Sequence, residues 1–114
     1  MDFLTVWLFA QNIQPLQPGI YNAGRGYIEI ARKGSRFCYR GSSPNGVTVA
    51  SISPTANGYN IYRFNATLKQ VDSRKLEFGG RTYTLIETTV NSTGALADCL
   101  NSKSTFFQQE RFGR

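Results

Sequence analysis

The segment Gly26–Gly41, GYIEIARKGSRFCYRG, constrains the fold most strongly because apolar and polar side chains alternate along it on both sides of a glycine. Successive side chains of a β-strand point to opposite faces, so this pattern predicts an antiparallel hairpin. A two-residue turn at Lys33–Gly34 would place Ile30 opposite Phe37, and a longer loop with Gly34 in the left-handed conformation would serve as well. One face then carries apolar residues and the other carries polar residues and a cysteine: Ile28, Ile30, Phe37 and Tyr39 against Glu29, Arg36, Cys38 and Arg40.

Turn dipeptides recur through the rest of the chain and divide it into further short strands. These strands are expected at residues 19–22, 47–53, 59–71, 75–78 and 81–89. Residues 59–71 are too many for a usual strand, so they form either one bent strand or two strands separated by a bulge or turn at Asn65. Gly79–Gly80 is expected to join the last two strands, with Leu76 opposite Tyr83.

The period of the apolar residues changes near the C-terminus. Leu96, Cys99 and Leu100 recur at helical spacing, which predicts a short helix over about residues 93–101, capped by Ser92 or Thr93. The polar tail, residues 102–114, either frays or adds a last strand at 104–108. The predicted fold is therefore all-β. It is a single domain over 19–101, an antiparallel meander of about six or seven strands that closes into a barrel or a tight sandwich, with one short C-terminal helix.

The chain contains two cysteines, Cys38 in the hairpin and Cys99 in the predicted helix. A disulfide between them would close a loop of about 60 residues and, by chain entropy, stabilise the fold by roughly 4 kcal/mol. Such a bond would fasten the short helix over the outer or end surface of the sheet, unless a bulge turned Cys38 inward. The alternative is a pair of buried free thiols.

The N-terminal residues resemble the end of a signal peptide. Phe3–Ala10 is a continuous apolar run that ends on a small residue, and polar, proline-containing sequence follows to Pro18. No basic residue precedes the run, so residues 1–10 are expected to be a truncated or atypical signal of a secreted or periplasmic protein. The alternative is a buried N-terminal segment or an edge strand. The run is too short to span a membrane.

Basic residues outnumber acidic residues by 13 to 7, which gives a formal net charge of +6. A basic surface with exposed aromatic rings suits an anionic ligand or a protein partner, although the same charges can form a solvated outer face. The candidate surface residues are Tyr27, Arg36, Arg40 and Arg63.

The chain has no histidine and no CxxC motif, and its carboxylates form no paired motif. The commonest general base and the commonest metal ligand are therefore missing, and no catalytic residue, metal or cofactor is predicted. The expected function is that of a small exported, non-catalytic binding or structural module. The alternative is an OB-like barrel that stacks single-stranded nucleic acid on a basic aromatic surface.

Overall fold

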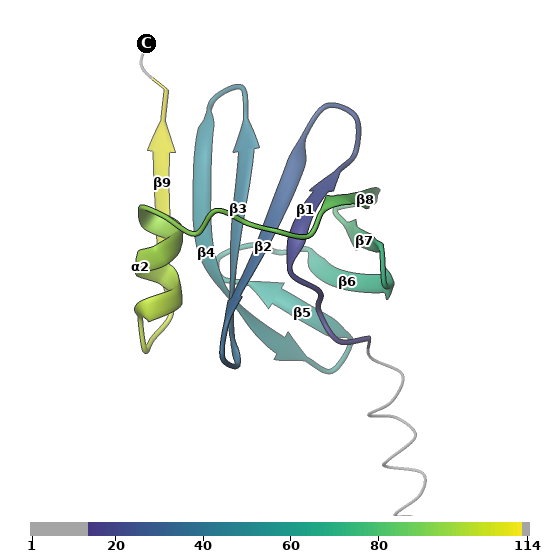
Figure 1. Cartoon of the computed structure of the whole chain (residues 1–114), viewed down its shortest axis with the longest axis horizontal. Coiled ribbons are helices and arrows are strands. Elements are labelled where there is room, and N and C mark those ends of the chain that lie inside the picture. Colours follow the sequence, from purple (N-terminus) through teal and green to yellow (C-terminus); the bar gives the residue numbers. More distant parts are fainter. Residues whose placement is uncertain (1–13, 113–114) are drawn as a thin grey trace, which may run out of the picture.

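The computed structural model describes residues 14–112 and shows a closed antiparallel barrel of eight strands (Figure 1). Each strand pairs with the next one along the chain, and the last pairs back onto the first. The all-β prediction is confirmed, and the barrel rather than the sandwich is the correct form. The strands are β1 (Gly19–Asn22), β2 (Tyr27–Lys33), β3 (Arg36–Ser43), β4 (Gly46–Thr55), β5 (Gly58–Ile61), β6 (Thr67–Asp72), β7 (Lys75–Phe78) and β8 (Arg81–Glu87).

Side chains fill the interior of the barrel, as expected for eight strands. The rings of Tyr39 and Phe64 meet edge to face with centroids 5.3 Å apart, and Phe78 lies within 6.3 Å of both. Aliphatic and tyrosine side chains from every strand surround them. The buried interior cluster consists of Leu16, Tyr21, Ile28, Ile30, Tyr39, Ala50, Ile52, Ile61, Leu68, Leu76 and Leu85.

A second core lies outside the barrel, beneath the one helix that residues 14–112 form. The helix α2 (Ala95–Asn101) packs on the outer face of β2, β3 and β4, and Figure 1 shows it beside the final strand β9 (Phe107–Arg111). The buried residues between helix and barrel are Ala31, Cys38, Val49, Leu96, Cys99 and Leu100. The helix predicted near the C-terminus therefore covers the polar face of the opening hairpin, as expected.

The long strand β4 is shared by two partners on one of its edges. Residues 52–55 pair with β5 and residues 46–50 pair with β9. Ser51 marks the boundary, because its N–H donates to the carbonyl oxygen of Phe106 and its own carbonyl accepts from the N–H of Tyr62, both at 2.9 Å. The tail therefore does form a last strand, but three residues later than predicted.

The register of the opening hairpin differs from the prediction by two residues. The turn lies at Gly34–Ser35, so that Lys33 pairs with Arg36 and Ile30 pairs with Tyr39. Gly34 has a φ of 62°, and a glycine at the first of two turn positions suits the II′ turn that hairpins prefer. The predicted turn would have forced Lys33 into that conformation. A shift by an even number of residues leaves every side chain on its predicted face.

Two further predictions about turns agree with the structure. The second hairpin is confirmed, with Leu76 opposite Tyr83. Residues 59–71 divide into β5 and β6, so the two-strand alternative is correct. The break covers residues 62–66 and so includes Asn65, as predicted, and within residues 14–112 Arg63 is the single non-glycine residue with positive φ, at 74°.

The prediction for the helix N-terminus is wrong. Gly94 occupies the N-cap with a φ of 61°, and no side chain caps the helix. Neither Ser92 nor Thr93 is needed, because packing and the bond to Cys99 hold this short helix in place. The predicted signal-like segment, residues 1–10, lies outside the described residues. Between residues 14 and 112, no helix has the length and apolar character needed to cross a bilayer.

Candidate functional site

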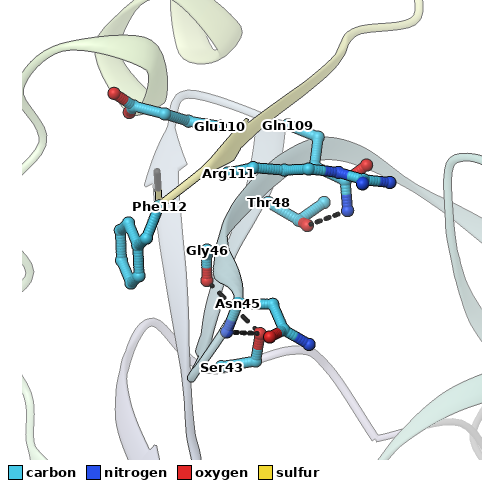
Figure 2. A pocket seen from close by; sticks show the side chains of 8 residues that line it. All are labelled: Ser43, Asn45, Gly46, Thr48, Gln109, Glu110, Arg111 and Phe112. Atoms are coloured by element: carbon cyan, nitrogen blue, oxygen red, sulfur yellow. Dashed lines mark hydrogen bonds between the residues drawn. The ribbon is translucent and has the colours of Figure 1, made fainter. Parts of the chain in front are cut away.

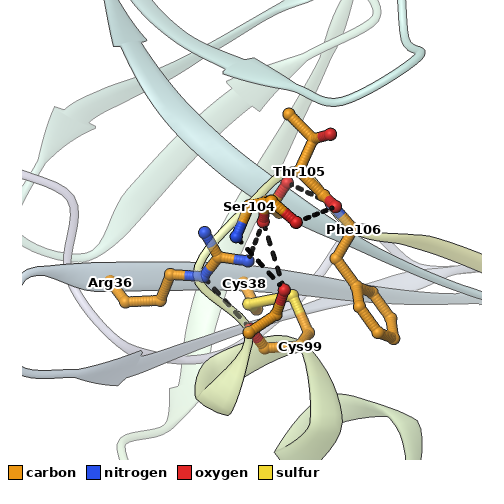
Figure 3. The surroundings of a disulfide bond; sticks show 8 residues. Arg36, Cys38, Cys99, Ser104, Thr105 and Phe106 are labelled. Carbon is orange, nitrogen blue, oxygen red and sulfur yellow. Dashed lines mark hydrogen bonds between the residues drawn. A yellow bond between two sulfur atoms is a disulfide. The ribbon is translucent and has the colours of Figure 1, made fainter.

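The disulfide between Cys38 and Cys99 joins β3 to α2 (Figure 3). The two Cα atoms are 6.3 Å apart, and neither residue is exposed to solvent. The predicted bond is confirmed, and it lies at the centre of the second core. Because the bond is covalent and buried, it fixes both the position of the helix and the start of the loop that leads to β9.

Arg36 lies beside this disulfide and binds backbone rather than presenting its charge to a ligand. Its Nε donates to the carbonyl oxygen of Cys99 at 3.1 Å, and one Nη donates to the carbonyl oxygen of Ser104 at 2.7 Å. On the neighbouring strand, Lys33 Nζ donates to the side-chain oxygen of Asn101. The carbonyl of Cys99 belongs to the last turn of the helix and also accepts from the N–H of Ser102 at 3.2 Å, so Arg36 adds a second donor there. The sequence predicted Arg36 as a surface residue, and the structure shows it holding the helix and the following loop.

Arg40 pairs with Glu29 on the adjacent strand. Arg40 Nε donates to Glu29 Oε1 at 2.7 Å, and Nη2 contacts the same oxygen and also donates to the carbonyl oxygen of Asn91 at 3.1 Å. The side chains are 22% and 10% exposed, so the pair is largely removed from water. Within residues 14–112 the structure records this ion pair and no other. Most of the guanidinium is therefore already occupied.

Tyr27 and Arg40 line a shallow groove of about 370 Å³ between the outer face of the sheet and the start of α2. Tyr27 is 39% exposed, and its hydroxyl accepts a hydrogen bond of 3.4 Å from Ser42 Oγ. Polar and apolar residues both line the groove: Tyr27, Glu29, Arg40, Ser42, Val47, Val49, Thr93, Gly94, Ala95, Leu96 and Glu110. These two predicted site residues do lie together.

Arg63 lies apart from that groove, in the turn between β5 and β6. Its guanidinium carbon is 4.9 Å from the ring centroid of Phe107 and 5.8 Å from that of Tyr62. A cation over an aromatic face is favourable, and Arg63 is exposed, so its charge remains available to solvent. Hydrogen bonding to Thr105, with a smaller contribution from Arg63, lowers the pKa of Tyr62.

A polar hollow of about 430 Å³, which was not predicted, lies where β9 meets the β3–β4 turn. In Figure 2, Thr48, Gln109 and Arg111 extend to the same side of the strands, and Glu110 extends to the other. Gln109 Nε2 donates to Thr48 Oγ1 at 3.4 Å. The lining residues are Ser43, Asn45, Gly46, Thr48, Gln109, Glu110, Arg111 and Phe112. The pairing of β4 with β9 creates this hollow, and residue patterns within either segment alone do not indicate it.

Fold and disulfide together define residues 14–112 as a small, disulfide-bonded, up-and-down β-barrel with one external helix and one external strand. Comparison with known proteins finds no matching family model, no matching curated protein and no matching solved structure. Across the described part of the chain, no three histidine, cysteine, aspartate or glutamate side chains gather to hold a metal ion.

Proposed function

We propose that this protein is an exported, non-catalytic binding module whose barrel serves as a rigid scaffold for its external helix and strand. The observation that carries the proposal is the buried disulfide between Cys38 and Cys99. Disulfides persist in oxidising compartments and are rare where thiols are kept reduced. The apolar segment Phe3–Ala10 supports the same compartment.

The charge of the surface indicates the kind of partner. All lysine and arginine residues except Arg114 fall within residues 14–112, where one ion pair is recorded. A surface with so many cations and so few paired carboxylates attracts anionic molecules and accelerates their association. The preferred ligand is therefore an anionic group or an acidic protein surface.

The alternative, a single-stranded nucleic-acid binder, needs exposed aromatic rings on which bases can stack. Phe37, Tyr39 and Phe64 instead pack on or within the barrel interior. The alternative is left with Tyr27 beside Arg40 and with the half-buried Tyr62 and Phe107 beside Arg63, and we therefore favour the first proposal.

Thiol titration of protein purified from its native host tests the proposal. Under denaturing, non-reducing conditions we expect no free cysteine, and N-terminal sequencing of the same sample should find residues 1–10 removed. Two free thiols, or an intact Met1 on protein from the cytosolic fraction, would contradict export.

A further inference from the structure

The strand β9 forms an edge of the sheet. Its register with β4 is antiparallel and runs from Gly46 opposite Arg111 to Ala50 opposite Phe107. Within residues 14–112 no strand pairs with its other side, and Figure 1 shows β9 at the outer margin of the molecule. Residues 108–111 are all exposed. An exposed edge is a template onto which another strand can pair.

The hydrogen bonds at the two ends of β9 show which backbone groups face outward. The carbonyl of Phe106 accepts from β4 at 2.9 Å, and the N–H of Phe112 donates to the carbonyl oxygen of Asn45 at 3.0 Å. In an antiparallel ladder, alternate residues turn both backbone groups toward the same partner. Gln108 and Glu110 therefore bond to β4 as well.

It follows that Phe107, Gln109 and Arg111 direct their N–H and carbonyl groups away from β4, toward the open side. Together they offer three donors and three acceptors in the spacing that an incoming strand requires. The side chains of the same three residues share one face of the sheet.

That face carries positive charge at both ends of the edge. Arg63 lies over the ring of Phe107 at one end, and Arg111 itself lies at the other. Phe107 and Arg111 are four residues apart, which is about 13 Å along a strand. Glu110 points to the opposite face and lines the groove beside Leu96, so it does not neutralise this pair.

We propose that the open edge of β9 binds an extended segment of an acidic partner protein, which adds a strand to the sheet. Two carboxylates four positions apart on that segment would pair with Arg63 and Arg111, while its backbone bonds to Phe107, Gln109 and Arg111. The inference rests on the proposed function, because it names the binding surface and the partner class of the same module. Main-chain bonds supply affinity in this mode of recognition, and alternate side chains supply specificity.

A second copy of the chain fits the same edge less well. Antiparallel pairing of two copies centred on Gln109 would place Arg111 opposite the partner's Phe107, over which the partner's Arg63 lies. Each copy also carries a net charge of +6. Like charges facing one another across a strand pair are destabilising, and an acidic segment avoids that repulsion.

The test uses a fluorescein-labelled peptide of alternating threonine and valine that carries two glutamates four positions apart. A control peptide carries the glutamates three positions apart, which places them on opposite faces of a strand. In fluorescence anisotropy with the full chain, we expect the first peptide to bind at least about fivefold more tightly than the second, with affinity that falls as salt is added.

Two proline substitutions distinguish the role of the open edge of β9 from that of its hydrogen bonds to β4. Gln109→Pro removes an outward N–H and should weaken binding of the first peptide at least about tenfold with little change in melting temperature. Gln108→Pro removes an N–H that bonds to β4, so this matched control should lower the melting temperature.

The double variant Arg63→Asn/Arg111→Gln keeps the edge intact and removes its charge. Asparagine tolerates positive φ, so the turn at residue 63 is preserved. We expect about five- to tenfold weaker binding of the first peptide and the loss of most of its salt dependence. This variant decides the question if Gln109→Pro fails to fold.

Several outcomes would overturn the inference. One is a peptide affinity that neither Gln109→Pro nor Arg63→Asn/Arg111→Gln changes. Another is a dimer, detected by sedimentation, that Gln109→Pro dissociates. A third is binding of oligothymidylate in place of the peptide. Absence of peptide binding with both cysteines bonded refutes the edge and leaves the exported module standing. If the native protein has free thiols and still binds the peptide, export is refuted and binding at the edge of β9 is not.

Discussion

Arg36 Nε and the carbonyl oxygen of Cys99 are joined by a hydrogen bond of 3.1 Å, immediately beside the disulfide that Cys99 forms with Cys38 (Figure 3). The end of the helix is thus fastened twice to β3, once covalently and once by a charged donor. Hydrogen bonds from charged groups are stronger than those between neutral groups, so the two attachments reinforce each other.

Replacement of both cysteines by alanine should lower the free energy of unfolding by roughly 4 kcal/mol, since the bond links residues 61 apart in sequence. Urea unfolding monitored by far-UV circular dichroism measures this loss of unfolding free energy. Wild-type protein treated with a reductant is the matched control and should lose a similar amount. Equal stability of oxidised and reduced wild type would contradict the expectation.

Gly46→Ala should separate β9 from β4. An added Cβ would overlap the carbonyl oxygen of Glu110 and lie 3.0 Å from the Cα of Arg111, and the φ of 155° is rarely adopted by other residues. We expect a loss of about 1–3 kcal/mol in unfolding free energy and rapid hydrogen exchange at the Phe112 amide.

The control for that substitution is Gly26→Ala, because a Cβ at residue 26 meets nothing within 4 Å. Its stability should stay within about 0.5 kcal/mol of wild type. If both variants keep a protected Phe112 amide, the close approach at Gly46 does not determine the β4–β9 pairing.

Glu29→Gln should destabilise the protein by about 2–3 kcal/mol, because it leaves the largely buried guanidinium of Arg40 without its counter-charge. Arg40→Met should cost a similar amount. In the double variant, neither unpaired charge remains, so its loss should be smaller than the sum by about 1 kcal/mol or more. Strict additivity in urea unfolding would show that the two side chains are not energetically coupled.

Stability should decline at alkaline pH through Tyr39. Burial, with a smaller repulsion from Tyr83, raises the pKa of Tyr39 from 10.0 to about 12 in the folded protein. Below pH 10 the Tyr39 hydroxyl is protonated in both the folded and the unfolded protein, so this group causes no loss of stability there. Between pH 10 and about 12 the unfolded chain ionises first, so up to about 2–3 kcal/mol is lost.

The variant Tyr39→Phe keeps the ring and removes the ionisable group, so its decline over this range should be smaller. Urea unfolding of both proteins at about pH 8 and about pH 12 provides the comparison. Parallel curves would show that other groups cause the alkaline loss.

Alternation of side chains was enough to predict the hairpins and the two faces of the barrel wall. The pairing of Leu76 with Tyr83 was predicted correctly because two glycines fix that turn. The opening hairpin was misplaced by two residues because Lys33–Gly34 and Gly34–Ser35 sort the faces equally well. The two turns differ in which residue takes the first position, and a type II′ turn prefers glycine there.

Features that depend on contacts distant in sequence were harder to predict. Cys38 and Cys99 could be paired because the chain has no other cysteines. The four predicted surface residues, by contrast, include Arg36, which holds the helix end, and Arg63, whose neighbour Phe107 lies 44 positions away. The hollow and open edge at β9 arise only after the tail pairs with β4, and nothing in the tail's own sequence specifies that partner.

The ring of strands is complete at Glu87, before the helix and the last strand begin. The interior cluster that stabilises the ring draws none of its fully buried residues from the segment after that point. Phe107 packs against this cluster, but residues 108–111 are exposed, so substitutions there act on a part of the chain that the barrel does not need for closure. The outermost strand is free to diverge in sequence, so proteins with the same barrel could acquire different partners without a loss of architecture.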